Sequence, residues 1–251
     1  MVRHENQPNG EPDPTIVRDA GPHDVVLSWS GGKDSAMALL ALQQDVGVRL
    51  AYLLTVVTED YQRITTHGVR RELLQQQSSA LGLGLLEVMI PATCTHDDYA
   101  ALMEQALTSP PLQGIRTHAF ADLYLADVRA YREENLAALD KTALFPVWGR
   151  DTRRFAEDFI ELGFKAKVVS LDPTVMEPDL AGHDFDNRFL AALPPTVDPC
   201  GENGEFHTFV YDGPVFRQPV PITVGQTLER DGFVYTDLVP TDPRTPPLHQ
   251  R

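Results

Sequence analysis

The chain has 251 residues, and its 21 lysines and arginines stand against 36 aspartates and glutamates, for a formal net charge of −15. This length can bury the core of one large domain with a smaller appendage. So acidic an average surface repels phosphate backbones and disfavours extended nucleic-acid or anionic-membrane binding. With two cysteines only, Cys94 and Cys200, a disulfide-rich scaffold and a Cys-x-x-Cys metal site are excluded.

The two ends of the chain lack the patterns of folded elements. Residues 1–23 are rich in Pro, Asn, Asp and Glu, and residues 240–251 have the same character, so we predict two disordered tails. The N-terminal segment has no apolar core of a signal peptide. No apolar run approaches the roughly 18 residues of a membrane span. We therefore expect a cytoplasmic protein without a membrane partner.

Between the tails, short apolar runs alternate with longer amphipathic stretches. Strands are predicted at residues 25–29, 48–57, 85–90, 114–120, 143–148 and 165–171, the last closing the series. Helices are predicted between them, at residues 35–44, 68–81, 96–107, 127–139 and 151–162. This alternation is typical of an α/β fold, an open parallel sheet with helices on both faces, which we assign to residues 24–171. Such sheets bind ligands at the carboxyl ends of their strands.

The pattern changes after Leu171. Prolines become frequent, and two alternating runs, residues 220–229 and 232–239, flank an Asp-Gly pair at 231 and 232. Asp-Gly between two such runs predicts a hairpin. We assign residues 172–239 to a small C-terminal β-containing subdomain on the substrate side of the sheet.

A phosphate-binding turn is predicted where the first strand ends and the first helix begins. It consists of Ser30, Gly31, Gly32, Lys33, Asp34 and Ser35. The glycines permit a tight turn and a close approach of the backbone, and the first-turn amides of a helix favour an anion. A Walker A loop fails on spacing, since it needs a glycine at Leu27 and a hydroxyl at Asp34. The alternative is an ordinary strand-to-helix turn with a capping serine.

A second candidate site follows the predicted sheet. Residues 198–216 hold Glu202, Glu205 and His207 around two further glycines. Carboxylates and an imidazole that converge beside glycines can bind a ligand or transfer protons. No His-Glu-x-x-His pattern is present, so a zinc helix is not indicated. From the residues alone, a solvated polar loop stays open as the alternative.

Both segments resemble known families. Residues 30–35 resemble the PP-loop of the N-type ATP pyrophosphatases, which implies an adenine nucleotide alpha-hydrolase-like fold and cleavage of ATP between its α and β phosphates. Residues 200–216 resemble the signature of the diphthine–ammonia ligase family, and further similar segments lie at residues 66–70, 121–123, 127–133 and 144–149. The likeness extends over residues 25–216. It departs at Ala121, where the family commonly has glycine.

The resemblance implies ATP and Mg²⁺ as cofactors, with ammonia and an acceptor carboxylate, on a protein or a small metabolite, as partners. Diphthine on an elongation factor is one such acceptor. Lys33 is expected to neutralise charge on the leaving pyrophosphate, and Asp34 to hold the metal. Glu202, Glu205 and His207 are expected to line the acceptor and ammonia side.

Three more residues are candidates for nucleotide contact. His67 and Asp122 both follow predicted strands at the ligand-binding edge of the sheet. Arg129 could reach phosphate, although Arg129 and Glu133 lie four apart on a predicted helix and could simply pair on its surface. His96 and His118, by contrast, are assigned to ordinary packing or solvent exposure.

The sequence thus predicts an ATP-dependent amide-forming ligase. It would adenylate an acceptor carboxylate, release pyrophosphate and AMP, and transfer ammonia. Two alternatives remain: a tRNA-modifying adenylating enzyme with the same loop, which the net charge disfavours, and a non-catalytic nucleotide-binding sensor.

Overall fold

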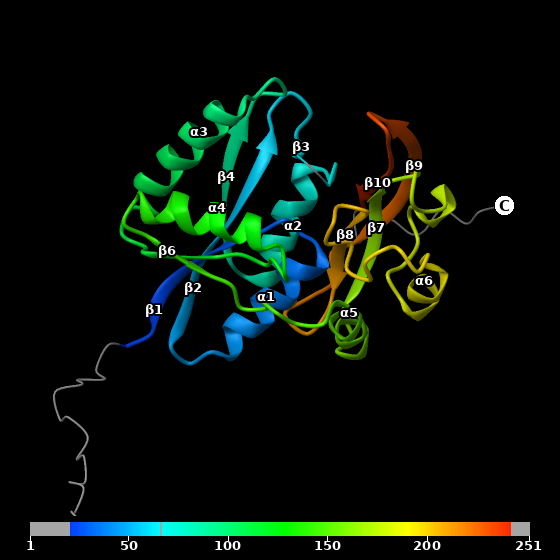
Figure 1. Cartoon of the computed structure of the whole chain (residues 1–251), viewed down its shortest axis with the longest axis horizontal. Coiled ribbons are helices and arrows are strands. Elements are labelled where there is room, and N and C mark those ends of the chain that lie inside the picture. The colour runs from blue at the N-terminus through cyan, green and yellow to red at the C-terminus, as the bar shows by residue number, and fades with distance from the viewer. Residues whose placement is uncertain (1–20, 66, 242–251) are drawn as a thin grey trace, which may run out of the picture.

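The computed structural model describes residues 21–65 and 67–241, which form two sheets flanked by helices (Figure 1). The tails were predicted at residues 1–23 and 240–251, and most of each, residues 1–20 and 242–251, lies outside this range; His23 and Pro240, by contrast, belong to strands. Among the described helices, none is both long and apolar enough to span a membrane.

The first sheet carries the predicted parallel strands. Its parallel strands are β1 (His23–Ser28), β2 (Val48–Thr58), β4 (Gly84–Ile90), β5 (Thr117–Ala119) and β6 (Thr142–Leu144). They lie in the spatial order β4-β2-β1-β5-β6, and β3 (Arg63–Ile64) pairs antiparallel with the end of β2. The carboxyl ends of β1, β2, β4 and β5 therefore meet at one edge.

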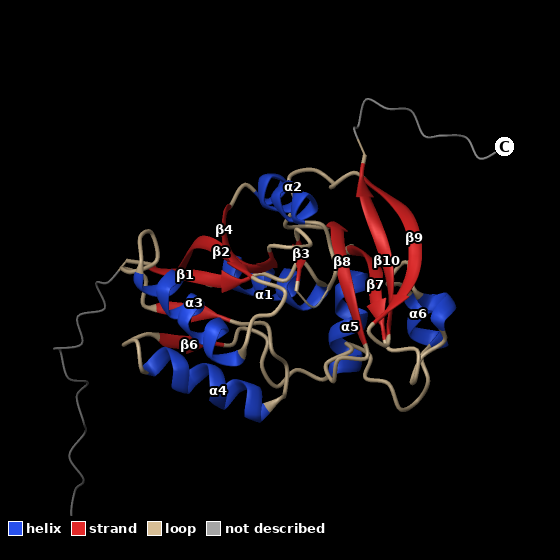
Figure 2. Ribbon diagram, turned by 90° about the horizontal axis from the view of Figure 1, so that it is seen from above, coloured by secondary structure: helices blue, strands red, loops and turns tan. Residues whose placement is uncertain are grey.

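Helices cover both faces of this sheet, as predicted. They are α1 (Lys33–Gln44), α2 (Arg71–Leu81), α3 (His96–Thr108) and α4 (Ala126–Ala137), and Figure 2 shows α2 and α4 on opposite sides of the strands. Because successive strand residues face opposite ways, Val25 and Leu27 join one core while Val26 joins another. The first core includes residues of α1 and α2, and the second includes Leu107 of α3 and Leu136 of α4.

The second sheet is antiparallel. It follows α5 (Thr152–Glu161) and contains β7 (Lys165–Leu171), β8 (Phe206–Asp212), β9 (Ile222–Arg230) and β10 (Phe233–Pro240) in the order β8-β7-β10-β9. The short helices η1 (Pro178–Leu180) and α6 (Asn187–Ala192) lie in the connection from β7 to β8. The expectation that residues 165–171 close the parallel series is wrong, because β7 pairs with β8 and β10. A buried apolar run has the same appearance in either kind of sheet, so its residues could not distinguish them.

The predicted hairpin is confirmed. β9 and β10 pair antiparallel across Asp231 and Gly232, whose φ angles are 53° and 82°. Two positive φ angles at the centre of a two-residue loop match the twist of a hairpin, which explains the Asp-Gly pair.

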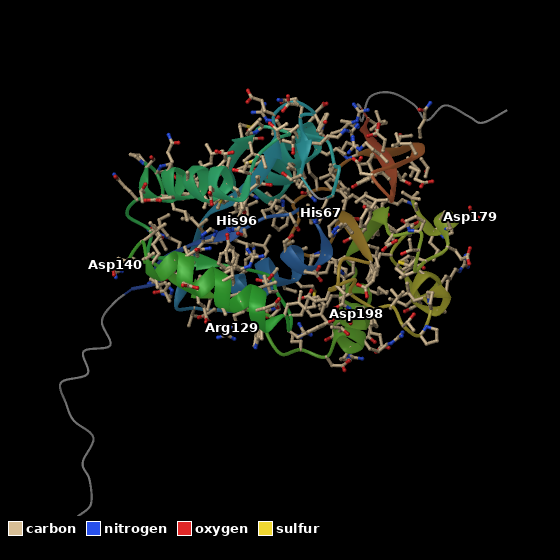
Figure 3. The ribbon with its side chains drawn as sticks, turned by 45° about the horizontal axis from the view of Figure 1, so that its top comes forward. His67, His96, Arg129, Asp140, Asp179 and Asp198 are labelled. Atoms are coloured by element: carbon tan, nitrogen blue, oxygen red, sulfur yellow. The ribbon has the colours of Figure 1, made fainter. Side chains whose placement is uncertain are left out.

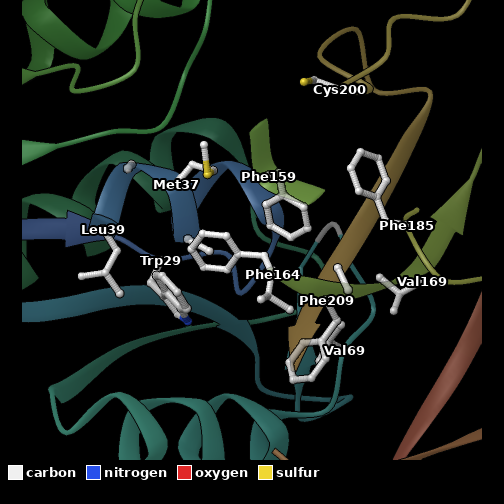
Figure 4. Packing of buried hydrophobic residues seen from close by; sticks show 14 of the residues in the cluster. Trp29, Met37, Leu39, Val69, Phe159, Phe164, Val169, Phe185, Cys200 and Phe209 are labelled. Atoms are coloured by element: carbon white, nitrogen blue, oxygen red, sulfur yellow. The ribbon is translucent and has the colours of Figure 1, made fainter. Parts of the chain in front are cut away.

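One hydrophobic core joins the two sheets (Figure 4). Trp29, which follows β1, and Leu39 of α1 belong to the same cluster as Phe159, Phe164 and Phe209. The rings of Phe159 and Phe164 stack with centroids 4.9 Å apart. This shared core holds β8 against the carboxyl end of β1, where the phosphate-binding turn is predicted.

Candidate active site

A cavity of about 560 Å³ lies at the carboxyl ends of β1, β2, β4 and β5 and is bordered by the segment that leads into β8. Most of the predicted site residues line it: Ser30, Lys33, Asp34, Ser35, His67, Asp122, Glu202 and His207. This is the ligand-binding edge that an open α/β sheet favours.

The turn between β1 and α1 presents hydroxyls and a helix N-terminus to the cavity. Gly31 has a φ of +78°, which an L side chain rarely adopts. The Gly32 amide donates to Ser30 Oγ at 3.3 Å, and Ser35 Oγ donates to Gly32 O at 2.9 Å. The amide of Lys33, which begins α1, donates instead to Thr208 Oγ1 at 3.0 Å. The second sheet thus caps this helix, and Ser30, Ser35 and the helix end together favour an anion.

Lys33 is buried, with 2 % of its surface exposed. Its Nζ donates to Asp34 Oδ2 at 2.9 Å and to the carbonyl of Cys200. Burial has the largest single effect and would lower the pKa of Lys33, but the attractions of Asp34, Cys200 and Glu202 together outweigh it and the pKa is raised. Lys33 is therefore a fixed positive charge in the wall of the cavity. The other oxygen of Asp34, Oδ1, is buried without a hydrogen-bond partner among the described residues.

Two neutral imidazoles lie beside this charge. The rings of His67 and His207 stack with centroids 4.3 Å apart (Figure 3 labels His67, between the two sheets). Burial lowers the pKa of His67 well below its usual range, and burial together with Lys33 lowers the pKa of His207 to about 4. Neither ring carries charge near pH 7, so both can act only as neutral hydrogen-bonding groups there.

Glu202 and Glu205 have different environments although they lie three residues apart. Glu202 lines the cavity, accepts from the Leu123 amide at 2.7 Å, and has its pKa raised to about 7, chiefly by burial. Glu205 accepts 3.0 Å hydrogen bonds from the amides of Asp198 and Asn203 and from Asn203 Nδ2. The structure does not bring Glu205 to the cavity, because these bonds turn its carboxylate into its own loop.

Two arginines of α4 also differ in whether they line the cavity. Arg132 lines the cavity and pairs with Asp122, with Nε and Oδ2 2.7 Å apart. Arg129 pairs with Glu133 at 2.8 Å and lies over the rings of Phe145 and Trp148, away from His67 (Figure 3). The predicted phosphate contact of Arg129 therefore has no support from its position, while the surface pair that the spacing allowed is present.

The two other histidines considered from the sequence, His96 and His118, lie as their assignment to packing or solvent exposure predicts. His118 is 2 % exposed, stacks on Phe120, and has Nε2 3.1 Å from Ser28 Oγ. His96 is exposed at the start of α3.

Sequence reasoning missed Arg132 and Thr208 as site residues. Arg132 was visible only as one of several charged residues on a predicted helix. Thr208 follows His207 in a strand-like run, where a threonine is ordinary. Their roles depend on contacts with distant segments, which local patterns do not record.

Comparisons with known proteins match this chain to one family. The model for the diphthamide synthase N-terminal domain matches residues 23–124, and the model for the C-terminal domain matches residues 151–235. A diphthine–ammonia ligase of Danio rerio is 23 % identical over 235 residues, which cover 81 % of this chain and 88 % of the relative. One of Schizosaccharomyces pombe is 26 % identical over 139 residues, covering 53 % of this chain and 22 % of the relative. The chain thus spans only about a fifth of the yeast protein.

Fold, cavity and comparisons together define the class: an ATP pyrophosphatase-type ligase, which forms a carbon–nitrogen bond. The turn at residues 30–35 brings the buried Lys33 and the carboxyl group of Asp34 to the wall of the cavity. The chain belongs to the diphthine–ammonia ligase family.

Proposed function

We propose that the chain activates an acceptor carboxylate with ATP and then converts it into an amide with ammonia. The observation that carries the proposal is the meeting of two segments in one cavity. The turn at residues 30–35 offers an anion site beside Lys33, and Glu202, from the loop before β8, and His207, from β8, face the same space. One segment suits the phosphates, and the other suits an acceptor and an amine.

In the first step, an oxygen of the acceptor carboxylate would attack the α-phosphorus of ATP. The new bond joins that oxygen to phosphorus, the bond to the β-phosphate oxygen breaks, and pyrophosphate leaves. Lys33, held as an ammonium by Asp34, would stabilise the charge that develops on the leaving group. Ser30, Ser35 and the N-terminal end of α1 would orient the pyrophosphate portion.

The residues also fit Mg²⁺. Asp34 Oδ1 is a buried carboxylate oxygen without a partner among the described residues, and Mg²⁺ at ATP sites commonly uses one or two carboxylates together with the phosphates. When bound, the ion would neutralise phosphate charge. No cluster of three or more potential metal ligands occurs within residues 21–65 and 67–241, so the phosphates would supply much of its coordination.

In the second step, ammonia would attack the acyl carbon, and AMP would leave as the carbon–oxygen bond breaks. The attacking nitrogen must lose a proton to form the amide. Glu202, with a pKa of about 7, can accept a proton at neutral pH, whereas His67 and His207 resist becoming charged. We assign the proton transfer to Glu202 and the hydrogen bonding of the acceptor to His207.

The printed names of the relatives make diphthine the first acceptor to test. Purified protein is incubated with ATP, Mg²⁺, ammonium and either a diphthine-bearing elongation factor or a panel of small carboxylates. We expect one AMP and one pyrophosphate per amide formed. Release of ADP and orthophosphate, or failure to bind ATP in a calorimetric titration, would contradict the proposal. The Lys33→Met variant is the control for contaminating activity.

A further inference from the structure

Gln77 lies at the centre of a buried hydrogen-bond network beneath the phosphate-binding turn. It comes from α2, is 0 % exposed, and is not among the described residues that line the cavity. Its Oε1 accepts from Trp29 Nε1 at 3.0 Å. Its Nε2 donates to the carbonyls of Gly31, at 3.0 Å, and Val210, at 2.6 Å. One carboxamide thus ties the turn to α2 and to β8.

These bonds hold one peptide unit of the turn in a single orientation. The Gly31 carbonyl accepts from Gln77 and also from the Val210 amide, at 2.9 Å. In a planar trans peptide the N–H points opposite to the C=O, so the Gly32 amide must point away from Gln77. It points to Ser30 Oγ, 3.3 Å away, and Ser30 lines the cavity.

The glycine at position 31 and Gln77 fit one another closely. A Cβ added to Gly31 would lie 2.8 Å from Gln77 Oε1 and 3.1 Å from a methyl group of Leu74. Since the peptide joins two glycines, its own conformational preferences restrain it weakly. Its orientation is therefore set from outside, by the side chain of Gln77 and the backbone of β8.

We propose that Gln77 is a positioning residue for the pyrophosphate portion of ATP. It acts through the Gly31–Gly32 peptide, which it turns so that the Gly32 amide points toward Ser30 at the cavity wall and can donate to an anion bound there. The inference rests on the proposed function, because it takes the anion to be the phosphates of ATP. Gln77 itself touches neither nucleotide nor acceptor.

The test compares ligands that contain or lack the pyrophosphate portion. Titration calorimetry measures binding of ATP, inorganic pyrophosphate and AMP, with Mg²⁺, to wild type and to Gln77→Met, which keeps the bulk of the side chain but not its hydrogen bonds. We expect ATP and pyrophosphate to bind about tenfold more weakly, the effect of roughly one lost hydrogen bond to a charged group. AMP binding should stay within about twofold.

Two further variants separate positioning from folding. Gln77→Asn keeps the carboxamide but withdraws it by about one carbon–carbon bond, 1.5 Å, and should show the same selective loss. Gln75→Met alters an exposed side chain of the same helix and should bind all three ligands as wild type does. The inference is overturned if the Gln77 variants lose equal affinity for AMP and pyrophosphate, or if both bind pyrophosphate as tightly as wild type does.

A measurement on the wild-type protein makes the outcome independent of any variant. In ¹⁵N-labelled protein, the Gly32 amide resonance should shift when pyrophosphate is added and respond much less to AMP. If pyrophosphate binds but the Gly32 amide resonance does not shift, the inference is overturned. Wild-type protein that binds neither ATP nor pyrophosphate would instead overturn the proposed function itself.

Discussion

The two loops of the site are built in opposite ways. The turn at residues 30–35 is shaped largely by groups outside it: Gln77, Thr208 and Val210 hold its backbone from α2 and β8. The loop at residues 198–205 is shaped from within, because Asp198 and Glu205 accept hydrogen bonds from amides of the same loop. Only Glu202 of its carboxylates lines the cavity.

This difference separates residues that act on ligands from residues that hold a loop in place. In the first loop, Gln77 and β8 hold the backbone from outside, and Ser30 and Ser35 add hydrogen bonds to Gly32 from within. In the second loop, Glu202 lines the cavity while Glu205 bonds to the loop itself, so residue type alone does not predict the role of a glutamate. Substitution of a residue that acts on a ligand should therefore lower turnover, whereas substitution of a residue that holds a loop should lower stability.

The largest effect is expected at Lys33. Lys33→Met keeps an unbranched apolar stem near the rings of Phe185 and Phe206 but removes the charge. Turnover, measured as AMP and pyrophosphate released, should fall roughly 10²- to 10³-fold, the usual cost of one lost charge-stabilising group. Lys165→Met, which removes an exposed lysine paired with Asp212, is the matched control. A fall below about threefold would rule out the assigned role of Lys33.

The contrast between Glu202 and Glu205 is the sharpest test of the second loop. Glu202→Gln should reduce turnover about 10²-fold with little loss of stability, since the amide can still accept from Leu123. Glu205→Gln should leave turnover nearly unchanged but lower the free energy of unfolding by about 1–3 kcal/mol, because donors that now face a carboxylate lose a partner. Urea denaturation and product assays distinguish them, and the reverse pattern would exchange their roles.

The pH dependence identifies the base. Glu202 must be deprotonated to accept a proton, so activity at a constant concentration of free ammonia should rise with pH through an apparent pKa of about 7. In Glu202→Gln this rise should disappear. If His207 were the base, the inflection would lie near its pKa of about 4 instead. An inflection near 7 that survives in Glu202→Gln would remove Glu202 from the mechanism.

Thr208 connects the first loop to the second sheet, and its removal should have a moderate effect. Thr208→Val keeps the shape but removes the acceptor of the Lys33 amide at the start of α1. Loss of a helix cap of this kind costs about 1 kcal/mol of unfolding free energy. Thr223→Val, on the exposed strand β9, is the control and should cost nothing. Equal stability of the two variants in urea would show that the cap is unimportant.

The smallest effect is expected outside both loops. Arg129→Ala removes a half-exposed pair with Glu133, so stability should change by about 0.5 kcal/mol and the KM for ATP should not change. Arg132→Ala leaves Asp122 without its partner at the cavity wall, and its KM for ATP should be higher than that of Arg129→Ala. A rise in KM confined to Arg129→Ala would restore the phosphate contact predicted from the sequence.

Much of the local structure in both sheets could be predicted because its signals come from near neighbours in the chain. The helix predicted at residues 96–107 is α3 (His96–Thr108), and the Asp-Gly hairpin is present where it was expected. Periodicity and turn chemistry depend on near neighbours, which the sequence contains in full. The partners of β7 were not predictable in this way, since strand pairing is decided by segments far along the chain.

The sequence by itself determined that a tight glycine turn joins the first strand to the first helix, at the edge where such folds bind phosphates. Only the tertiary structure decided which side chains face that turn, because the decisive contacts join residues far apart in the chain. Lys33 and Thr208, which share a hydrogen bond, are 175 positions apart in the sequence, and Gly31 and Gln77 are 46 positions apart. Hydrogen bonds require atoms in contact, and a linear pattern of residue types does not specify which distant atoms will meet.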